Sequence, residues 1–245
     1  MIRWLLNNKK GAKSIGLGGL ITRVIFVLFT ALVLYQLWIF LHICWWIKFN
    51  PSSSAFMEDR LAVMQEKNPD VELRYKWVDY NKISNHLKRA VVAAEDSRFT
   101  DHEGFDWEGI QKAYEKNLKK GKIVAGGSTI SQQLAKNLFL STKRTPWRKA
   151  EEAVITLMLE KMLTKRRILE IYLNVIEWGD GVFGAEAASR HYYKTSASRL
   201  TRNQAARLAA MIPNPRFYDR HKSTRYLNRR TATIQARMHQ AVIPK

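Results

Sequence analysis

An uncharged apolar run from Val24 to Ile47 constrains this chain more than any other feature of its sequence. At about 1.5 Å per helical residue the run reaches ~36 Å, enough to cross a ~30 Å hydrocarbon core. Its tryptophans lie in the second half, where such side chains meet a membrane interface. A cleaved signal peptide is the alternative, but its apolar core is shorter and a small-residue cleavage site follows it. The run therefore predicts an uncleaved transmembrane helix over residues 24–47.

The charges on either side of this run predict its direction. Residues 48–82 carry six basic and six acidic residues, so their net charge is zero. The short first segment, residues 1–23, holds five basic residues and no acid: Arg3, Lys9, Lys10, Lys13 and Arg23. Since cytoplasmic flanks are enriched in Lys and Arg, we expect residues 1–23 in the cytoplasm and the remainder of the chain exported.

The formal charge of +20 favours an anionic partner, either nucleic acid, lipid headgroups or a diphosphate. Since residues 1–23 carry +5 of this charge and residues 48–82 none, the remaining +15 lies in residues 83–245. An exported position argues against nucleic acid. Cys44 is the only cysteine of the sequence, so no disulfide can form within the chain and cysteine usage does not indicate a redox compartment.

Apolar residues recur at helical spacing through most of the exported part, which predicts a mostly α fold. Residues 51–54 predict a turn and a short linker, and residues 216–245 a basic segment that closes the domain with a helix. We expect helices over residues 84–96, 107–119, 129–139, 146–163, 165–175, 183–192 and 201–211.

Glu95 is a carboxylate on a row that should face the core, four residues after Val91 and eight after Leu87. Burial would raise its pKa and suit it to general-base work near neutral pH. The alternative is a buried ion pair with Arg98 or a contact at the helix end. His102, nearby in the sequence, is expected to be structural.

A glycine pair at residues 126–127 precedes a helix that should begin at Ser128 or Thr129. Gln132 stands at the third position after Thr129, as in a capping box. The free N–H groups and the dipole of such a helix would seat an anion.

Gln133, Lys136 and Asn137 follow on the same helix, three and four residues apart, and should share one face. A row of amide, ammonium and amide beside a glycine turn favours ligand binding. A well-capped surface helix is the alternative reading.

The next helix should open at Thr145 and Pro146, with Arg148 and Lys149 in its first turn. The helix dipole disfavours cations there, and a bound anion would offset that cost. Glu152 is a second acid on an apolar row and could pair with Arg148, so a buried bridge and a functional role stay equally open. Further on, Lys165 is a candidate phosphate contact at the start of a stretch otherwise expected to serve packing.

These stretches resemble the peptidoglycan glycosyltransferases, glycosyltransferase family 51. The resemblance rests on five motifs in order over about 120 residues. They are Glu-Asp-x-x-Phe-x-x-His-x-Gly at 95–104, Gly-x-Thr-Ile-x-Gln-Gln-Leu-x-Lys-Asn at 127–137, Arg-Lys-x-x-Glu at 148–152, Lys-x-x-Ile-Leu-Glu-x-Tyr-Leu-Asn at 165–174, and the stretch from Ala205 to Pro213. Gln204 departs from the family pattern, where an acid is more usual.

The family resemblance implies that the predicted transmembrane helix is followed by a mostly α, lysozyme-like lobe and a smaller membrane-proximal lobe. We therefore expect a cytoplasmic segment at 1–23, the membrane helix at 24–47, a juxtamembrane linker at 48–83, the catalytic domain at 84–215 and a closing segment at 216–245. The sequence contains no Ser-x-x-Lys motif, so it resembles the monofunctional members, without a penicillin-binding domain.

The resemblance also implies the reaction, which is polymerisation of lipid II into β-1,4-linked glycan strands at the outer face of a bacterial inner membrane, with loss of undecaprenyl diphosphate. Glu95 would be the general base, and Glu152 would orient Arg148 and the diphosphate. The substrate-binding residues would be Ser128, Thr129, Gln133, Lys136, Asn137, Arg148, Lys149 and Lys165. We expect no obligatory cofactor. A divalent metal, if used, would be Mg²⁺ or Mn²⁺ carried by the substrate diphosphate. Expected partners are lipid II, the growing strand, membrane lipids and other cell-wall synthesis or division proteins, but no nucleic acid.

Two other functions remain open at the level of sequence. A lytic transglycosylase shares the lysozyme-like lobe and needs one catalytic acid, but it has no use for cations around a diphosphate. A non-catalytic membrane scaffold would use the basic surface to recruit wall enzymes, but it does not explain two acids on apolar rows.

Overall fold

The computed structural model describes residues 17–122, 126–141 and 145–245 and divides the chain into two units, Met1–His42 and Ile43–Lys245. Helix α1 (Leu17–Trp45) carries the apolar run. It measures about 44 Å, long and apolar enough to cross a membrane, and most of its large apolar side chains are exposed. The helix ends at Trp45 rather than residue 47. Of the flanking basic residues, Arg3, Lys9, Lys10 and Lys13 lie outside the described residues.

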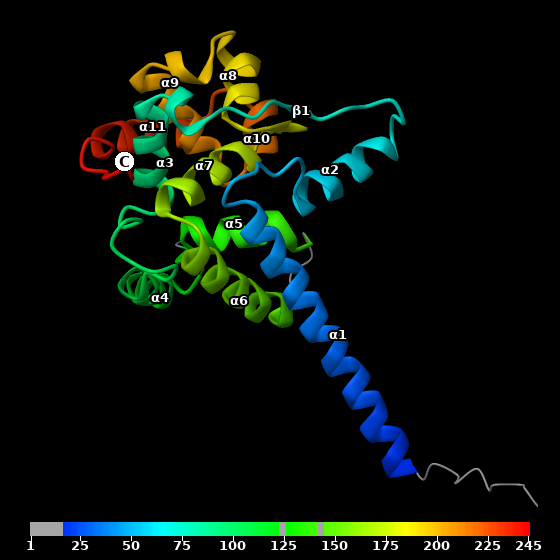
Figure 1. Ribbon diagram of the computed structural model, residues 1–245. Helices are drawn as coiled ribbons and strands as arrows, with labels where there is room; N and C mark the ends of the chain where they lie inside the picture. Colours follow the sequence, from blue (N-terminus) through cyan, green and yellow to red (C-terminus); the bar gives the residue numbers. More distant parts are fainter. Residues whose placement is uncertain (1–16, 123–125, 142–144) are drawn as a thin grey trace, which may run out of the picture. The chain divides into compact units, whose positions relative to one another are not determined.

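The second unit is mostly α-helical, as predicted (Figure 1). Its α-helices are α2 (Ala55–Gln65), α3 (Asn85–Glu95), α4 (Trp107–Lys120), α5 (Ile130–Phe139), α6 (Pro146–Met162), α7 (Lys165–Val175), α8 (Ala185–Tyr193), α9 (Arg202–Met211), α10 (Pro215–Arg220) and α11 (Arg225–Arg237). The described residues also form two 3₁₀ turns, η1 (Tyr80–Lys82) and η2 (Ala197–Arg199).

A small sheet is formed by β1 (Arg74–Tyr75), β2 (Glu177–Gly179) and β3 (Val182–Phe183), with β3 in the middle. Strand β1 runs parallel to β3, and β2 runs antiparallel to it. The segment 48–83, expected as a linker, thus contains α2, β1 and η1 and contributes an edge strand to the sheet.

Side-chain caps place most of the helix starts where the sequence predicts them. Thr129 and Gln132 form the expected capping box of α5, and Thr145 caps α6 ahead of Pro146. Helix α8 begins two residues later than predicted, because Val182 and Phe183 pair in the sheet and Gly184 turns the chain. At this glycine φ is +83°, and a Cβ would lie 2.7 Å from a backbone carbonyl oxygen.

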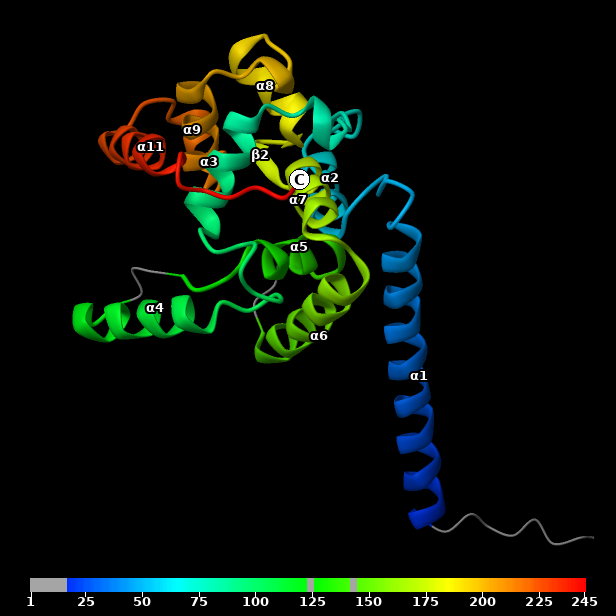
Figure 2. The same cartoon turned by 60° about the vertical axis from the view of Figure 1, so that its left-hand side comes forward.

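Two groups of helices build the core of this unit. Helices α3, α9 and α11 lie side by side, and α5 packs against both α6 and α7 (Figure 2). Leu87 and Val91 of α3 are fully buried, as their spacing predicts, and so are Leu134 of α5 and Ile168 of α7. The end of α3 therefore meets α5 and α11 in a region of low solvent access.

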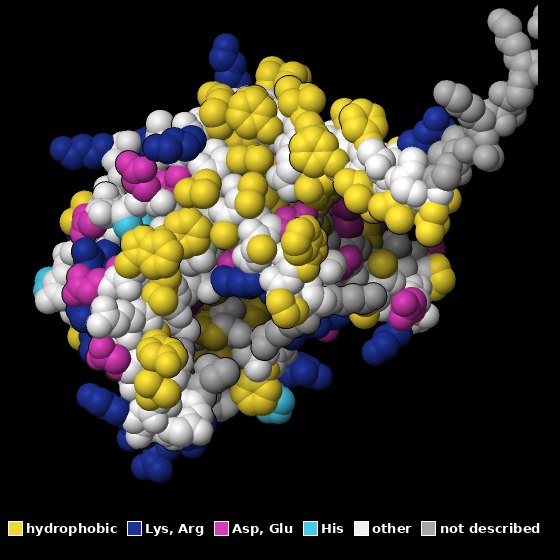
Figure 3. All heavy atoms as spheres, turned by 90° about the horizontal axis from the view of Figure 1, so that it is seen from below, with side chains coloured by type: hydrophobic (Ala, Val, Ile, Leu, Met, Phe, Trp, Pro, Cys, Tyr) yellow, Lys and Arg dark blue, Asp and Glu magenta, His cyan; other side chains and the backbone are white. Residues whose placement is uncertain are grey.

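Helix α4 takes no part in this core. All of its residues are described, and none of its side chains is buried. Figure 2 shows α4 extending away from the group of α3, α9 and α11. Trp107, Tyr114 and Leu118 occur seven and four residues apart on α4 and are exposed, as are Trp147 and Leu157 of α6. Exposed apolar side chains are prominent when the molecule is seen from below (Figure 3).

Candidate active site

Glu95 is the last residue of α3, and its side chain is only 10% exposed. Its Oε2 accepts a hydrogen bond from Gln133 Nε2 at 2.9 Å, and its Oε1 lies 3.2 Å from an Arg230 guanidinium nitrogen. Burial raises the pKa of Glu95, opposed by the Gln133 hydrogen bond and by the charges of Arg230 and Lys136. The predicted desolvated carboxylate is therefore present.

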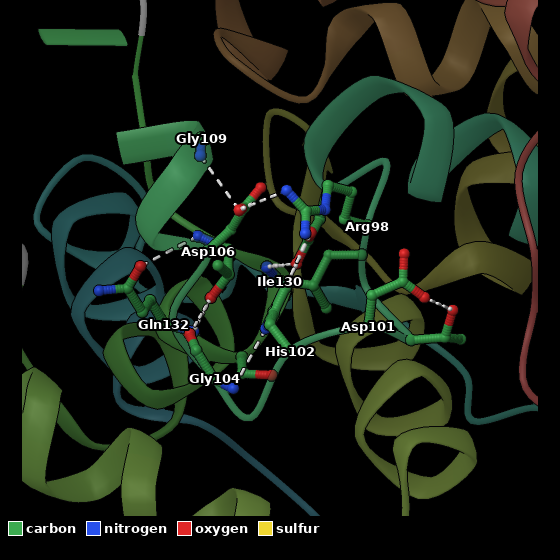
Figure 4. Close-up of polar contacts among 12 residues, drawn as sticks. Arg98, Asp101, His102, Gly104, Asp106, Gly109, Ile130 and Gln132 are labelled. Carbon is green, nitrogen blue, oxygen red and sulfur yellow. Dashed lines mark hydrogen bonds and ion pairs between the residues drawn. The ribbon is translucent and has the colours of Figure 1, made fainter. Parts of the chain in front are cut away.

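The prediction that Glu95 could pair with Arg98 is wrong, because its ion-pair partner is Arg230. Arg98 instead pairs with Glu108 of α4 and with Asp106 on the loop before it. Figure 4 shows the contact with Asp106. The ion pair of Glu95 comes from Arg230 on α11, more than a hundred residues away. Local spacing could not reveal this partner.

His102 has the structural role that the sequence predicts. Its Nε2 lies 3.0 Å from Asp96 Oδ1, and its Nδ1 accepts a hydrogen bond from the Gly104 amide (Figure 4). Asp96 in turn accepts a hydrogen bond of 3.0 Å from the Ile130 amide, in the first turn of α5. This network fastens the loop after Glu95 to the start of α5.

The sequence predicted an open anion-binding site at the start of α5. In the structure, protein groups already occupy amides at this position. The Asp96 carboxylate takes one of its amides, and the capping box takes two more. Thr129 is buried, and its hydroxyl also donates to the Gly104 carbonyl at 2.7 Å. The Asp96 carboxylate is thus the anion that the dipole of α5 stabilises.

A hollow of about 160 Å³ opens beside Glu95. Residues 93–97 at the end of α3 form one wall and residues 126–129 another, with Asp106 and Gly109 completing the lining. Glu95, Ser128 and Thr129 of the predicted site thus line one cavity. Glu152, Lys136 and Arg148 do not line it.

The row predicted on α5 is only partly directed at Glu95. Gln133 bonds to Glu95, and the charge of Lys136 acts on the same carboxylate. The Lys136 ammonium also lies 5.6 Å from the centre of the Phe56 ring. Asn137 is buried and donates to the Gln133 carbonyl of its own helix at 2.7 Å, so its amide supports α5.

At the start of α6, Glu152 is buried among cations. Lys149 donates a hydrogen bond to Glu152 Oε1, whereas Arg148 Nη1 lies 3.6 Å from Oε2, beyond hydrogen-bond reach. The predicted partner Arg148 is thus an ion-pair neighbour, and Lys149 makes the bond. Arg148 Nε and Nη1 are buried with no hydrogen-bond acceptor among the described residues.

Lys165 has a partner within the protein. Its ammonium lies 2.8 Å from Glu160 Oε1 and 4.7 Å from the centre of the Phe99 ring. Glu160 also accepts a hydrogen bond from Ser131 of α5. The structure therefore places Lys165 in a link between α5, α6 and α7, and its contact with phosphate stays a prediction.

Sequence reasoning missed two residues around Glu95. Tyr172 of α7 is fully buried and donates a hydrogen bond of 3.0 Å to Gln133 Oε1. Arg230 stands three residues after Leu227 and four before Ile234, both of which are buried. That spacing was a signal that this arginine faces inward.

Comparisons with known proteins agree with these motifs. The family model described as Transglycosylase matches residues 62–239. The chain belongs to this family. The match extends on both sides of the predicted catalytic range 84–215 and includes α11, which carries Arg230. Family membership makes the protein an enzyme that transfers glycosyl groups.

Curated relatives are similar over most of their length. A protein of Methylobacillus flagellatus named biosynthetic peptidoglycan transglycosylase is 72% identical over 212 residues, 86% of this chain and 93% of the relative. Proteins of the same name from Laribacter hongkongensis and Chromobacterium violaceum are 66% and 63% identical, over 91% of this chain and 98% and 100% of the relatives.

Proposed function

We propose that this protein is a peptidoglycan glycosyltransferase that polymerises lipid II into β-1,4-linked glycan strands and releases undecaprenyl diphosphate. The observation that carries the proposal is the buried carboxylate of Glu95 beside a cavity, with cations on α5 and α6. The names of the relatives support the substrate class.

Glu95 acts as the general base in this proposal. It takes the proton from the 4-hydroxyl of the acceptor sugar while that oxygen bonds to the anomeric carbon of the growing strand. The bond from this carbon to the diphosphate oxygen breaks, and its electron pair leaves with undecaprenyl diphosphate. Because an α-linked donor gives a β-linked product, a single displacement with inversion accounts for the stereochemistry. The raised pKa of Glu95 makes it a stronger base than an exposed glutamate.

Cations stabilise the charge that develops on the leaving diphosphate. Arg148 supports this role, because its buried Nε and Nη1 have no acceptor among the described residues. Lys136, Lys149 and Lys165 add positive charge, and Glu152 holds Lys149 and Arg148 at the start of α6. Ser128, Thr129, Gln133 and Asn137 position the substrate, directly or through the loops and helix that they brace.

The chemistry of the site fits a metal that arrives with the substrate. The described residues hold no group of three or more His, Cys, Asp or Glu side chains placed to bind a metal ion. Glu152 is already matched by two cations of its own helix. We therefore propose that a divalent ion, Mg²⁺ or Mn²⁺, belongs to the diphosphate and that no cofactor is obligatory.

We propose that α1 anchors the enzyme in the bacterial inner membrane by a single span, with residues 1–23 in the cytoplasm and the catalytic unit in the periplasm. The exposed apolar residues of α4 and α6 support a small lobe at the membrane surface, where lipid II is found. Membrane lipids, the growing strand and other cell-wall synthesis or division proteins are the proposed partners, and nucleic acid is not.

Polymerisation of purified lipid II by the detergent-solubilised full chain tests the proposal. Glycan strands and undecaprenyl diphosphate should form together. Release of anhydro-muropeptides from finished peptidoglycan, without polymerisation of lipid II, would indicate a lytic transglycosylase instead. Folded protein without either activity would indicate a scaffold.

A further inference from the structure

Both oxygens of the Glu95 carboxylate are held, and the groups that hold them come from two different helices. Gln133 of α5 donates to Oε2 at 2.9 Å, and Arg230 of α11 lies 3.2 Å from Oε1. The side chain is 10% exposed, so water has little part in fixing its orientation.

On the first side, Tyr172 determines which end of the Gln133 amide faces Glu95. The Tyr172 hydroxyl donates to Gln133 Oε1 at 3.0 Å, so that the NH₂ group is turned to the carboxylate. A reversed amide would put its oxygen against an anion and leave the Tyr172 hydroxyl without an acceptor. Burial, together with the charges of Glu95 and Asp96, raises the pKa of Tyr172 well above its usual range, so the hydroxyl stays a donor.

On the second side, Arg230 is committed to Glu95. Buried Leu227 and Ile234 fix the inner face of α11 one turn before and after it. The Arg230 side chain is 26% exposed, its Nε is buried without a partner, and no other acceptor for its guanidinium occurs among the described residues. Burial raises the pKa of Tyr218 of α10, and the nearby charge of Arg230 opposes that rise.

We propose that Arg230 and the Tyr172–Gln133 pair are positioning residues that clamp Glu95 from two sides, keeping its carboxylate ionised and in one orientation. The proposal rests on the proposed role of Glu95 as general base and extends the active site to α11, outside the five motifs. The other charged groups that act on this cluster are Lys136 of α5 and Asp96, which follows α3.

The clamp predicts a change in pH dependence that a structural contact would not produce. A general base works only when deprotonated, so the acidic limb of the rate profile follows the pKa of Glu95. Burial raises that pKa, and Arg230 and the Gln133 bond lower it. Loss of either partner should therefore move the acidic limb to higher pH, and activity should recover in alkaline buffer.

The experiment measures polymerisation of lipid II by the full chain as a function of pH, with kcat and KM determined separately. For Arg230→Gln we expect the acidic limb to move up by about one pH unit, with kcat up to about tenfold lower at pH values below the limb and an unchanged KM for lipid II. Tyr172→Phe should move the limb in the same direction by less. Arg230→Lys should return the acidic limb most of the way to its original pH. If Arg230→Gln does not fold, Tyr172→Phe carries the test, because it removes only the hydroxyl that orients Gln133.

Two matched controls remove the same groups elsewhere. Arg229→Gln deletes an exposed charge of the same helix, and Tyr80→Phe deletes a buried hydroxyl that donates to the Pro244 carbonyl. Neither should move the limb. An unmoved limb in folded Arg230→Gln, or a loss seen only in KM, would overturn the clamp. Near-normal activity of Glu95→Gln would instead refute the proposed base, so the two failures are distinguishable.

Discussion

Glu95 and Glu152 are both buried carboxylates, but they occupy different positions in their helices and are neutralised differently. Glu95 ends α3, where the helix dipole disfavours negative charge, and the arginine that pairs with it, Arg230, comes from the distant helix α11. Glu152 lies in the second turn of α6, and the two cations that pair with it, Arg148 and Lys149, lie in the first turn of the same helix.

This difference teaches how one residue type serves two functions. A carboxylate in an unfavourable position is a better proton acceptor, and Glu95 is held there by tertiary contacts. Glu152, which pairs with two cations of its own helix, is placed to support them. We therefore assign proton transfer to Glu95 and support of the cationic face to Glu152.

The largest effect is expected for Glu95→Gln. It keeps the volume of the side chain but removes the base, so polymerisation of lipid II should fall by about 10²- to 10⁴-fold. Glu72→Gln, which alters an exposed carboxylate, serves as the control. Comparable rates for the two variants, both folded by circular dichroism, would break the comparison.

A smaller loss is expected for Arg148→Gln, on the Glu152 side of the comparison. If Arg148 donates to the leaving diphosphate as we propose, its removal should lower kcat by roughly 10²-fold, because the charge that it stabilises develops in the transition state. The acidic limb of the pH profile should stay in place. The matched control is Arg199→Gln, an exposed arginine, and a shift of the limb in Arg148→Gln would show that α6 acts on the base after all.

Asp96 offers a third carboxylate, directly after Glu95, whose role is structural. Asp96→Asn weakens the bonds to the Ile130 amide and to His102, so the free energy of unfolding should fall by about 1.5–3 kcal/mol. Urea unfolding of the solubilised protein measures this. An unchanged midpoint would mean that the network does not hold the loop of Glu95 to α5.

For the last prediction we expect no effect, namely no covalent labelling by penicillin. Since the sequence has no Ser-x-x-Lys motif, a fluorescent penicillin should not label the chain. Gel fluorescence after incubation, with a penicillin-binding protein as the positive control, tests this. A labelled serine would show a second active site, for acyl transfer, in which neither Glu95 nor Glu152 takes part.

Much of this arrangement could be predicted from the sequence wherever it depends on local spacing. The row through Leu87 and Val91 predicted the burial of Glu95, and Thr129 with Gln132 predicted the start of α5. Helix periodicity is a local property, so these predictions needed no tertiary information.

Contacts across the fold could not be predicted in this way. The occupation of the α5 start by Asp96 and the pairing of Arg230 with Glu95 depend on how helices pack. Spacing alone also could not decide whether Arg148 or Lys149 bonds to Glu152, since both three- and four-residue separations allow contact on a helix.

The central claim is that Glu95, and not Glu152, carries the proton. The most direct test is the pH dependence of kcat/KM for lipid II in the unaltered enzyme, Glu95→Gln and Glu152→Gln. We expect an acidic limb set by one group with a pKa above that of an ordinary glutamate, absent from the residual activity of Glu95→Gln and retained in Glu152→Gln. A limb that persists in Glu95→Gln, or disappears in Glu152→Gln, would contradict this account.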